Sequence, residues 1–101
     1  MKIIGTAEGK KLYVHLIGEL DHHSAKKTRD DIDRLLMNSY ITELTIDMKD
    51  VSFMDSSGLG VILGRYKILA ERKGSVRICG ANRSVDKILR MSGIYSLVER
   101  S

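Results

Sequence analysis

Apolar and polar residues alternate near the start of the chain, from Lys11 to Gly18. The apolar side of this segment holds Leu12, Val14 and Leu16. A repeat of two residues is typical of a strand with one buried face. The preceding residues, Lys2 to Glu8, fit a short edge strand, and Gly9-Lys10 favours a tight turn between the two. The first 18 residues therefore predict a β-hairpin.

A helical repeat follows a polar connection. Asp21 and Ser24 in this connection are residue types that cap helix N-termini. Apolar positions then recur at steps of three and four residues, at Ala25, Thr28, Ile32, Leu35 and Leu36. That period predicts an amphipathic helix that ends near Ser39.

The middle of the chain changes from a strand pattern to a helix pattern. Glu43 to Met48 predicts a buried strand, and Val51 to Met54 continues as extended chain. From Ser57 to Lys73 the apolar residues form one helical stripe: Leu59, Ile62, Leu63, Tyr66, Leu69 and Ala70. Gly74 is a typical C-terminal stop for such a helix.

Three shorter elements complete the pattern. Val76 to Cys79 predicts a strand. A third helix, capped by Asn82 or Ser84, runs to about Ser92 and ends at Gly93. Tyr95 to Val98 predicts a last strand.

The order of elements is therefore β-β-α-β-α-β-α-β. Alternating strands and helices imply a mixed sheet with crossover helices. We predict a single α/β domain over residues 1–101, with a four- or five-stranded mixed sheet and about three helices packed mainly on one face. A length of 101 residues and a hydrophobic content of 43% suit one core of this size.

Composition narrows the setting. No apolar run approaches the length of about 20 residues that a membrane span needs, and the first residues contain no signal-peptide core. Cys79 is the only cysteine, which excludes an intrachain disulfide and a thiolate metal site. We therefore expect a cytoplasmic protein without cofactors and without a membrane partner.

Charge is unevenly distributed along the chain. Residues 1–64 hold 8 basic and 10 acidic side chains, whereas residues 65–101 hold 9 basic and 3 acidic ones. A basic half suits either nucleic acid or an acidic protein surface. Nucleic-acid modules usually add stacking aromatics or a recognition motif, and the chain has four Tyr, one Phe and no Trp. A solvated face or a docking surface for an acidic protein is the better interpretation.

The strongest local motif lies between the central strand and the helix that follows it. The run Asp55-Ser56-Ser57-Gly58-Leu59-Gly60 places hydroxyl groups at a helix N-terminus. Backbone N–H groups are unpaired there, so a phosphate on an accessible serine would be close to donors. Simple N-capping by Asp55, Ser56 or Ser57 is the alternative, and local sequence alone favours it.

The helix that follows this motif has an unusual outer side. Val61, Arg65, Ile68 and Arg72 lie opposite its predicted core stripe. Glycine inside a helix is unfavourable by about 1 kcal/mol relative to alanine, so Gly60 and Gly64 suggest close approach of another surface. That surface is either the protein's own sheet or a partner. Val61 and Ile68, which we expect to be exposed, favour a partner.

Catalytic interpretations fit less well. A serine-hydrolase elbow needs Gly-x-Ser-x-Gly, and the first glycine is missing before both Ser56 and Ser57. The run Gly5 to Lys11 is one residue too short for a P-loop and lacks its Ser or Thr. His22 and His23 have no further ligand at a useful spacing for a metal, and Cys79 fits packing better than catalysis. We expect no enzyme activity.

Longer runs of the sequence resemble a known family. Gly18-Glu19-Leu20-Asp21-His22-His23 and Phe53-Met54-Asp55-Ser56-Ser57-Gly58-Leu59-Gly60-Val61-Ile62-Leu63-Gly64-Arg65-Tyr66-Lys67 resemble STAS-domain anti-sigma-factor antagonists, specifically those of the sporulation branch. Arg90-Met91-Ser92-Gly93 is similar to the end of that family's third helix.

The resemblance implies a regulatory switch. The partner would be an anti-sigma factor that is also a serine kinase and binds ATP and magnesium itself. It would phosphorylate Ser56, which would end the complex, and a serine phosphatase would reset the switch. The free protein would be a monomer without direct contact to nucleic acid. Together with the outer side of the helix described above, the resemblance gives the expected partner-binding residues: Asp21, Asp55, Ser57, Gly58, Gly60, Val61, Gly64, Arg65 and Ile68.

Three alternatives stay open at this point. The first is a stress-response antagonist of the same family, the second a small hydrolase that uses Ser56 with His22 or His23, and the third a basic nucleic-acid-binding domain. Family members usually continue into a C-terminal helix, and this sequence ends at Ser101 before one. Either that helix has been removed from this sequence or this member lacks it.

Overall fold

The computed structural model describes all 101 residues. Two strands, β1 (Lys2–Glu8) and β2 (Lys11–Leu20), form the predicted antiparallel hairpin. The chain continues through α1 (Ala25–Leu35), β3 (Glu43–Met54), α2 (Ser56–Glu71), β4 (Ser75–Cys79) and α3 (Arg83–Ser92). A 3₁₀ turn, η1 (Ile94–Ser96), and the short strand β5 (Glu99–Arg100) complete it.

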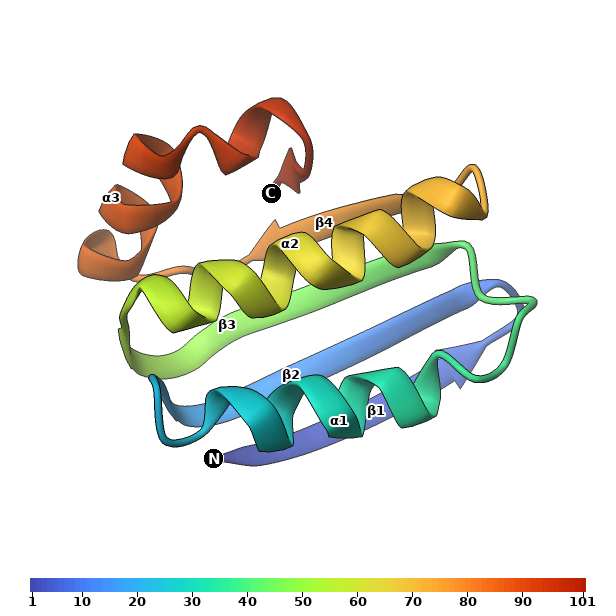
Figure 1. Cartoon of the computed structure of the whole chain (residues 1–101), viewed down its shortest axis with the longest axis horizontal. Helices are drawn as coiled ribbons and strands as arrows, with labels where there is room; N and C mark the ends of the chain where they lie inside the picture. The colour runs from blue at the N-terminus through green and yellow to red at the C-terminus, as the bar shows by residue number, and fades with distance from the viewer.

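The five strands lie in the sheet in the order in which they occur in the chain. β1 is antiparallel to β2, and β2, β3, β4 and β5 are parallel to one another. Right-handed crossovers that always step in the same direction place their helices on the same face. Figure 1 shows this arrangement, with α1 and α2 side by side across the sheet and α3 beyond α2. The predicted sheet type and one-sided helix cover are confirmed.

Two details differ from the prediction. β3 is one continuous strand of 12 residues, because Val51 stays paired with β2 beyond the first irregularity in the register, and Phe53 and Met54 stay paired beyond the second. The predicted strand at Tyr95 to Val98 is wrong. Its first two residues lie in η1 instead, and pairing with β4 begins only at Glu99.

The middle position of α2 explains a larger error. The predicted stripe placed Leu63 in the core and Val61 outside it, whereas Leu63 is 37% exposed and Val61 only 5%. A helix that packs against a sheet and against a helix on each side buries a wider part of its circumference than a helix at the edge of a layer, so different residues point into the core. α2 is such a helix, since it lies between α1 and α3 (Figure 1).

The face of the sheet without helices carries a cluster of polar side chains. The His15 ring bridges two carboxylates of β3, with Nδ1 3.1 Å from Asp47 Oδ2 and Nε2 2.7 Å from Asp50 Oδ2. The first register irregularity of β3 lies between these two aspartates. Tyr13 donates its hydroxyl to Asp47. The cluster therefore ties β2 to the segment of β3 that leads to Ser56.

Candidate functional site

Ser56 is the first residue of α2 and is exposed. The residue before it, Asp55, has extended backbone and is the N-cap, with its Oδ1 accepting a hydrogen bond of 2.8 Å from the Ser57 backbone N–H. Of the three possible caps, the structure thus selects Asp55. The Ser56 hydroxyl makes no hydrogen bond within the protein and is free to react or to meet a partner.

Gly58 allows the first turn of α2 to lie directly on the sheet. A Cβ atom at this position would overlap Met54 Cγ and would lie 3.1 Å from Leu20 Cγ. Met54 and Leu20 are both at most 1% exposed and have little room to move. Gly58 therefore acts from beneath the site, where it fixes how close Ser56 comes to the ends of β2 and β3.

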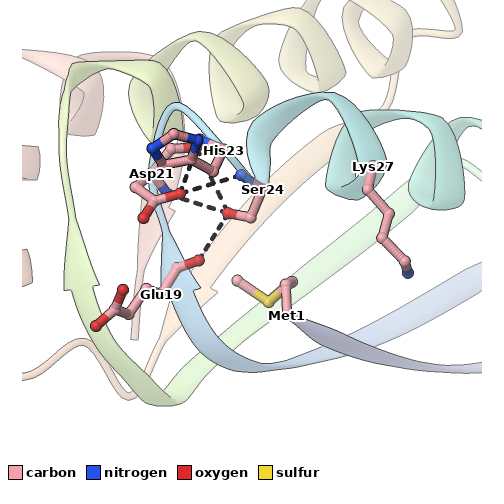
Figure 2. Close-up of a pocket in the computed structure, with 6 residues that line it drawn as sticks. All are labelled: Met1, Glu19, Asp21, His23, Ser24 and Lys27. Carbon is pink, nitrogen blue, oxygen red and sulfur yellow. Dashed lines mark hydrogen bonds between the residues drawn. The ribbon is translucent and has the colours of Figure 1, made fainter.

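The loop after β2 lies beside Ser56 and is internally braced. Figure 2 shows Asp21 at its centre, where Oδ1 accepts hydrogen bonds from the backbone N–H groups of His23, at 2.9 Å, and Ser24, at 3.0 Å. The Ser24 hydroxyl in turn donates to the Glu19 carbonyl at 2.6 Å. The bond from the Ser24 N–H is the main cause that holds the pKa of Asp21 below its usual value.

Asp55 connects this loop to α2. While Oδ1 caps the helix, Oδ2 accepts a hydrogen bond of 3.2 Å from the His22 backbone N–H. Both loops lie at the carboxyl ends of parallel strands, at the same end of the sheet in Figure 1. This shared end brings Asp21 and Ser56, 35 residues apart in the sequence, onto one surface.

Gly60 and Gly64, unlike Gly58, line an open flank of α2. Alanine at Gly60 or Gly64 would have no atom from any other part of the protein within 4 Å of its Cβ, which excludes tight packing against the sheet or a neighbouring helix as their cause. A hollow of about 320 Å³ adjoins Gly60, and the basic side chains of Lys26 and Arg29 line its α1 side. Beside Ser57, then, the molecule offers bare helix backbone and positive charge.

Three residues expected on this flank are placed differently. Val61 belongs to the core, and Ile68 is half-buried, so neither is the exposed apolar contact that we predicted. Arg65 is 7% exposed, with its Nε 2.9 Å from Asp33 Oδ1. Burial lowers the pKa of Arg65, and the charge of Asp33 opposes this shift.

Arg72, also predicted on the outer side, stabilises the fold instead. Its guanidinium donates to the carbonyl oxygens of Leu36, Asn38 and Ile41, at 2.6, 3.3 and 3.1 Å. These three carbonyls lie in the connection between α1 and β3, which no local sequence signal links to Arg72. The interaction holds the C-terminal end of α2 against that connection.

The residues considered for catalysis stay apart. The His22 and His23 rings stack edge-to-face with each other at 5.7 Å, and neither is hydrogen-bonded to Ser56. No group of three His, Cys, Asp or Glu side chains is arranged to hold a metal ion. Cys79 is partly buried, which raises the pKa of its thiol. None of the helices combines the length and the apolar character that a membrane span requires.

Comparison with known proteins identifies the family. The sequence profile of the STAS domain matches residues 2–100. An anti-sigma F factor antagonist of Paenibacillus polymyxa is 40% identical over 87 residues, which cover 86% of this chain and 74% of that protein. The chain belongs to the STAS-domain anti-sigma factor antagonists. An anti-sigma-B factor antagonist of Bacillus subtilis is 30% identical over 90 residues, which cover 89% of this chain and 81% of that one.

Solved structures of other proteins share the fold. SpoIIAA in its phosphorylated form is 26% identical, with a TM-score of 0.77 over 99% of this chain and 91% of that chain. SpoIIAA in its unphosphorylated form superposes with a TM-score of 0.78, at 24% identity, over 99% of this chain and 87% of the other. A crystal structure of a Thermotoga maritima protein reaches a TM-score of 0.88 at 20% identity, over 97% and 84% of the two chains.

Proposed function

We propose that this chain binds an anti-sigma factor that is also a serine kinase, and that phosphorylation of Ser56 by that kinase ends the complex. The observation that carries the proposal is the exposed, unbonded Ser56 hydroxyl at the start of α2, freed from capping by Asp55. The names of the relatives, antagonists of anti-sigma F and anti-sigma-B factors, support the class of partner.

The fold should tolerate the modification. A phosphate adds about −1.5 to −2 charge at pH 7, directly beside Asp55. The positive end of α2 offsets this repulsion by about 0.3–1 kcal/mol at an exposed site. SpoIIAA, with the same fold, has been solved in phosphorylated and unphosphorylated forms, which supports a change of binding rather than of fold.

The partner surface in this proposal surrounds Ser56. It comprises the braced Asp21 loop, the first turn of α2 and the open flank at Gly60 and Gly64. Val61 and Arg65 support that flank from beneath, and the half-buried Ile68 lies at its margin. A kinase must reach the serine, so a dianion at Ser56 would lie inside this interface, where burying it unpaired is unfavourable.

The proposed switch needs no cofactor of its own. ATP and magnesium belong to the partner kinase, and a separate serine phosphatase restores the free hydroxyl. The chain itself acts as a binding protein without catalysis, in a reducing cytoplasm in which Cys79 stays a thiol.

Four variants test the proposal with the cognate anti-sigma factor, Mg²⁺ and ATP, read out by intact mass and by binding. Ser56→Ala should bind without gaining phosphate, and Ser56→Asp should bind about two orders of magnitude more weakly, a loss of roughly 2.7 kcal/mol. Ser57→Ala should still gain one phosphate. Ser84→Asp, which adds the same charge at the exposed start of α3, should bind as the wild type does. Phosphate on Ser56→Ala protein at the wild-type rate would disprove the assignment.

A further inference from the structure

β1 is the one long strand edge that the fold leaves unpaired. It pairs with β2 on one side only, and the opposite edge of the sheet is β5, which has two residues. Exposed edges of this length are usually protected by charged side chains, proline or a bulge, and β1 carries charge only at its two ends, Lys2 and Glu8. The chain contains no proline, and the register between β1 and β2 runs without interruption over seven residue pairs.

The hairpin geometry determines which backbone groups face outward. Glu8 pairs with Lys11 across the two-residue turn, in which Gly9 has a φ of +59°. Residues that flank such a turn are hydrogen-bonded to each other, and bonded pairs recur at every second residue. The Lys10 carbonyl points the other way and accepts from the Glu43 N–H at 3.1 Å. The N–H and C=O groups of Ile3, Gly5 and Ala7 therefore face solvent.

The sequence of β1 is complementary to itself about Gly5. In an antiparallel pair of two β1 strands centred there, Lys2 faces Glu8, Ile3 faces Ala7 and Ile4 faces Thr6 of the other copy. Opposite charges meet at both ends, and small or apolar side chains meet between them. Like charges never face each other, so no cross-strand pair in this arrangement is repulsive.

We propose that β1 pairs with β1 of a second copy of this chain, around a two-fold axis at Gly5. The two sheets then join into one continuous sheet, and three residues of each copy supply paired N–H and C=O groups: Ile3, Gly5 and Ala7. Ile4, 44% exposed in the single chain, gains cover from Thr6 of its neighbour. This closed, symmetric pairing uses the edge of each copy once, so it stops at a dimer.

The pairing leaves the switch site accessible. Ser56 follows β3, two strands away from the free edge of β1. A strand pair of seven residues buries less than about 1,200 Å², the range of weak interfaces. We therefore expect a concentration-dependent dimer, and the predicted monomer at high dilution.

Charge reversal tests the proposal by sedimentation velocity of the full chain between about 10 μM and 1 mM, the range in which weak interfaces associate. Lys2→Glu turns two attractive pairs into two repulsive ones and should weaken the dimer about tenfold or more. Glu8→Lys should do the same, and the double variant should restore association. Lys87→Glu, an equal charge change on the exposed side of α3, should dimerise as the wild type does.

Hydrogen exchange locates the interface. Amides of Ile3, Gly5 and Ala7 should exchange fast in dilute protein and slow down as concentration rises. The Thr6 amide, bonded to β2, should be slow throughout. Ala7→Pro, which removes only an outward N–H, should dissociate the dimer and keep the fold. A monomer over the whole range, failure of the double variant to restore association, or a dimer that leaves these three amides fast would each overturn the proposal.

Discussion

Replacing Gly58 by alanine tests whether the close contact between α2 and the sheet is as tight as described. The new Cβ would overlap Met54 and press on Leu20, and overpacking of this kind costs about 1–3 kcal/mol. The gain in helix propensity returns at most about 1 kcal/mol. We expect a net loss of about 1–2 kcal/mol, or a fall in Tm of roughly 4–15 °C for a domain of this size.

Gly60→Ala is the matched control in the same helix. Its Cβ would meet no atom within 4 Å, so only the propensity term remains, and stability should rise by about 0.5–1 kcal/mol. Urea denaturation, monitored by circular dichroism, measures the free energy of unfolding of both variants, and we expect the same m-value for both. The reasoning fails if Gly58→Ala is as stable as the wild type, or if both variants lose stability equally.

Three further changes probe other contacts. Val61→Glu should leave the protein largely unfolded by circular dichroism, because a carboxylate in the core costs several kcal/mol, and a folded variant would contradict the burial of Val61. The hydrogen bond to Asp50, and to a smaller extent the one to Asp47, raises the pKa of His15. Protonated His15 therefore stabilises the folded protein fully below about pH 6.5, and this stabilisation is lost as pH rises through the raised pKa. His15→Gln should remove that dependence from the urea midpoint. Arg72→Ala should cost about 1–3 kcal/mol by the same assay, with little recovery in Arg72→Lys, since one ammonium cannot reach all three carbonyls.

Local sequence signals correctly predicted those helix and strand ends that are determined by residues at the end itself. Asn82 caps α3 with its side chain, and Gly93 ends it at a φ of +79°, both positions that residue type alone indicates. The hairpin at Gly9 is of the same kind. Each of these features depends on contacts within a few residues.

Contacts between distant segments were not predictable in this way. The buried side of α2 depends on the helices that flank it, and the apolar pattern of one helix does not show which helices pack beside it. Val61 and Arg65 were misplaced for that reason. Likewise, the link from Asp55 to the His22 N–H spans 33 residues, and only the shared end of two parallel strands brings these groups together.

The order of strands in the sheet has a consequence for synthesis. Each strand pairs with the one made just before it, so a growing chain always finds its partner already present. Folding can then advance from the N-terminus without the closure of long loops. When α2 has left the ribosome, β1, β2 and β3 can already form a sheet, and Ser56 at the end of β3 is in place before β4 and β5 have joined that sheet. A nascent chain would therefore carry its switch residue in place before β4 and β5 pair with the sheet.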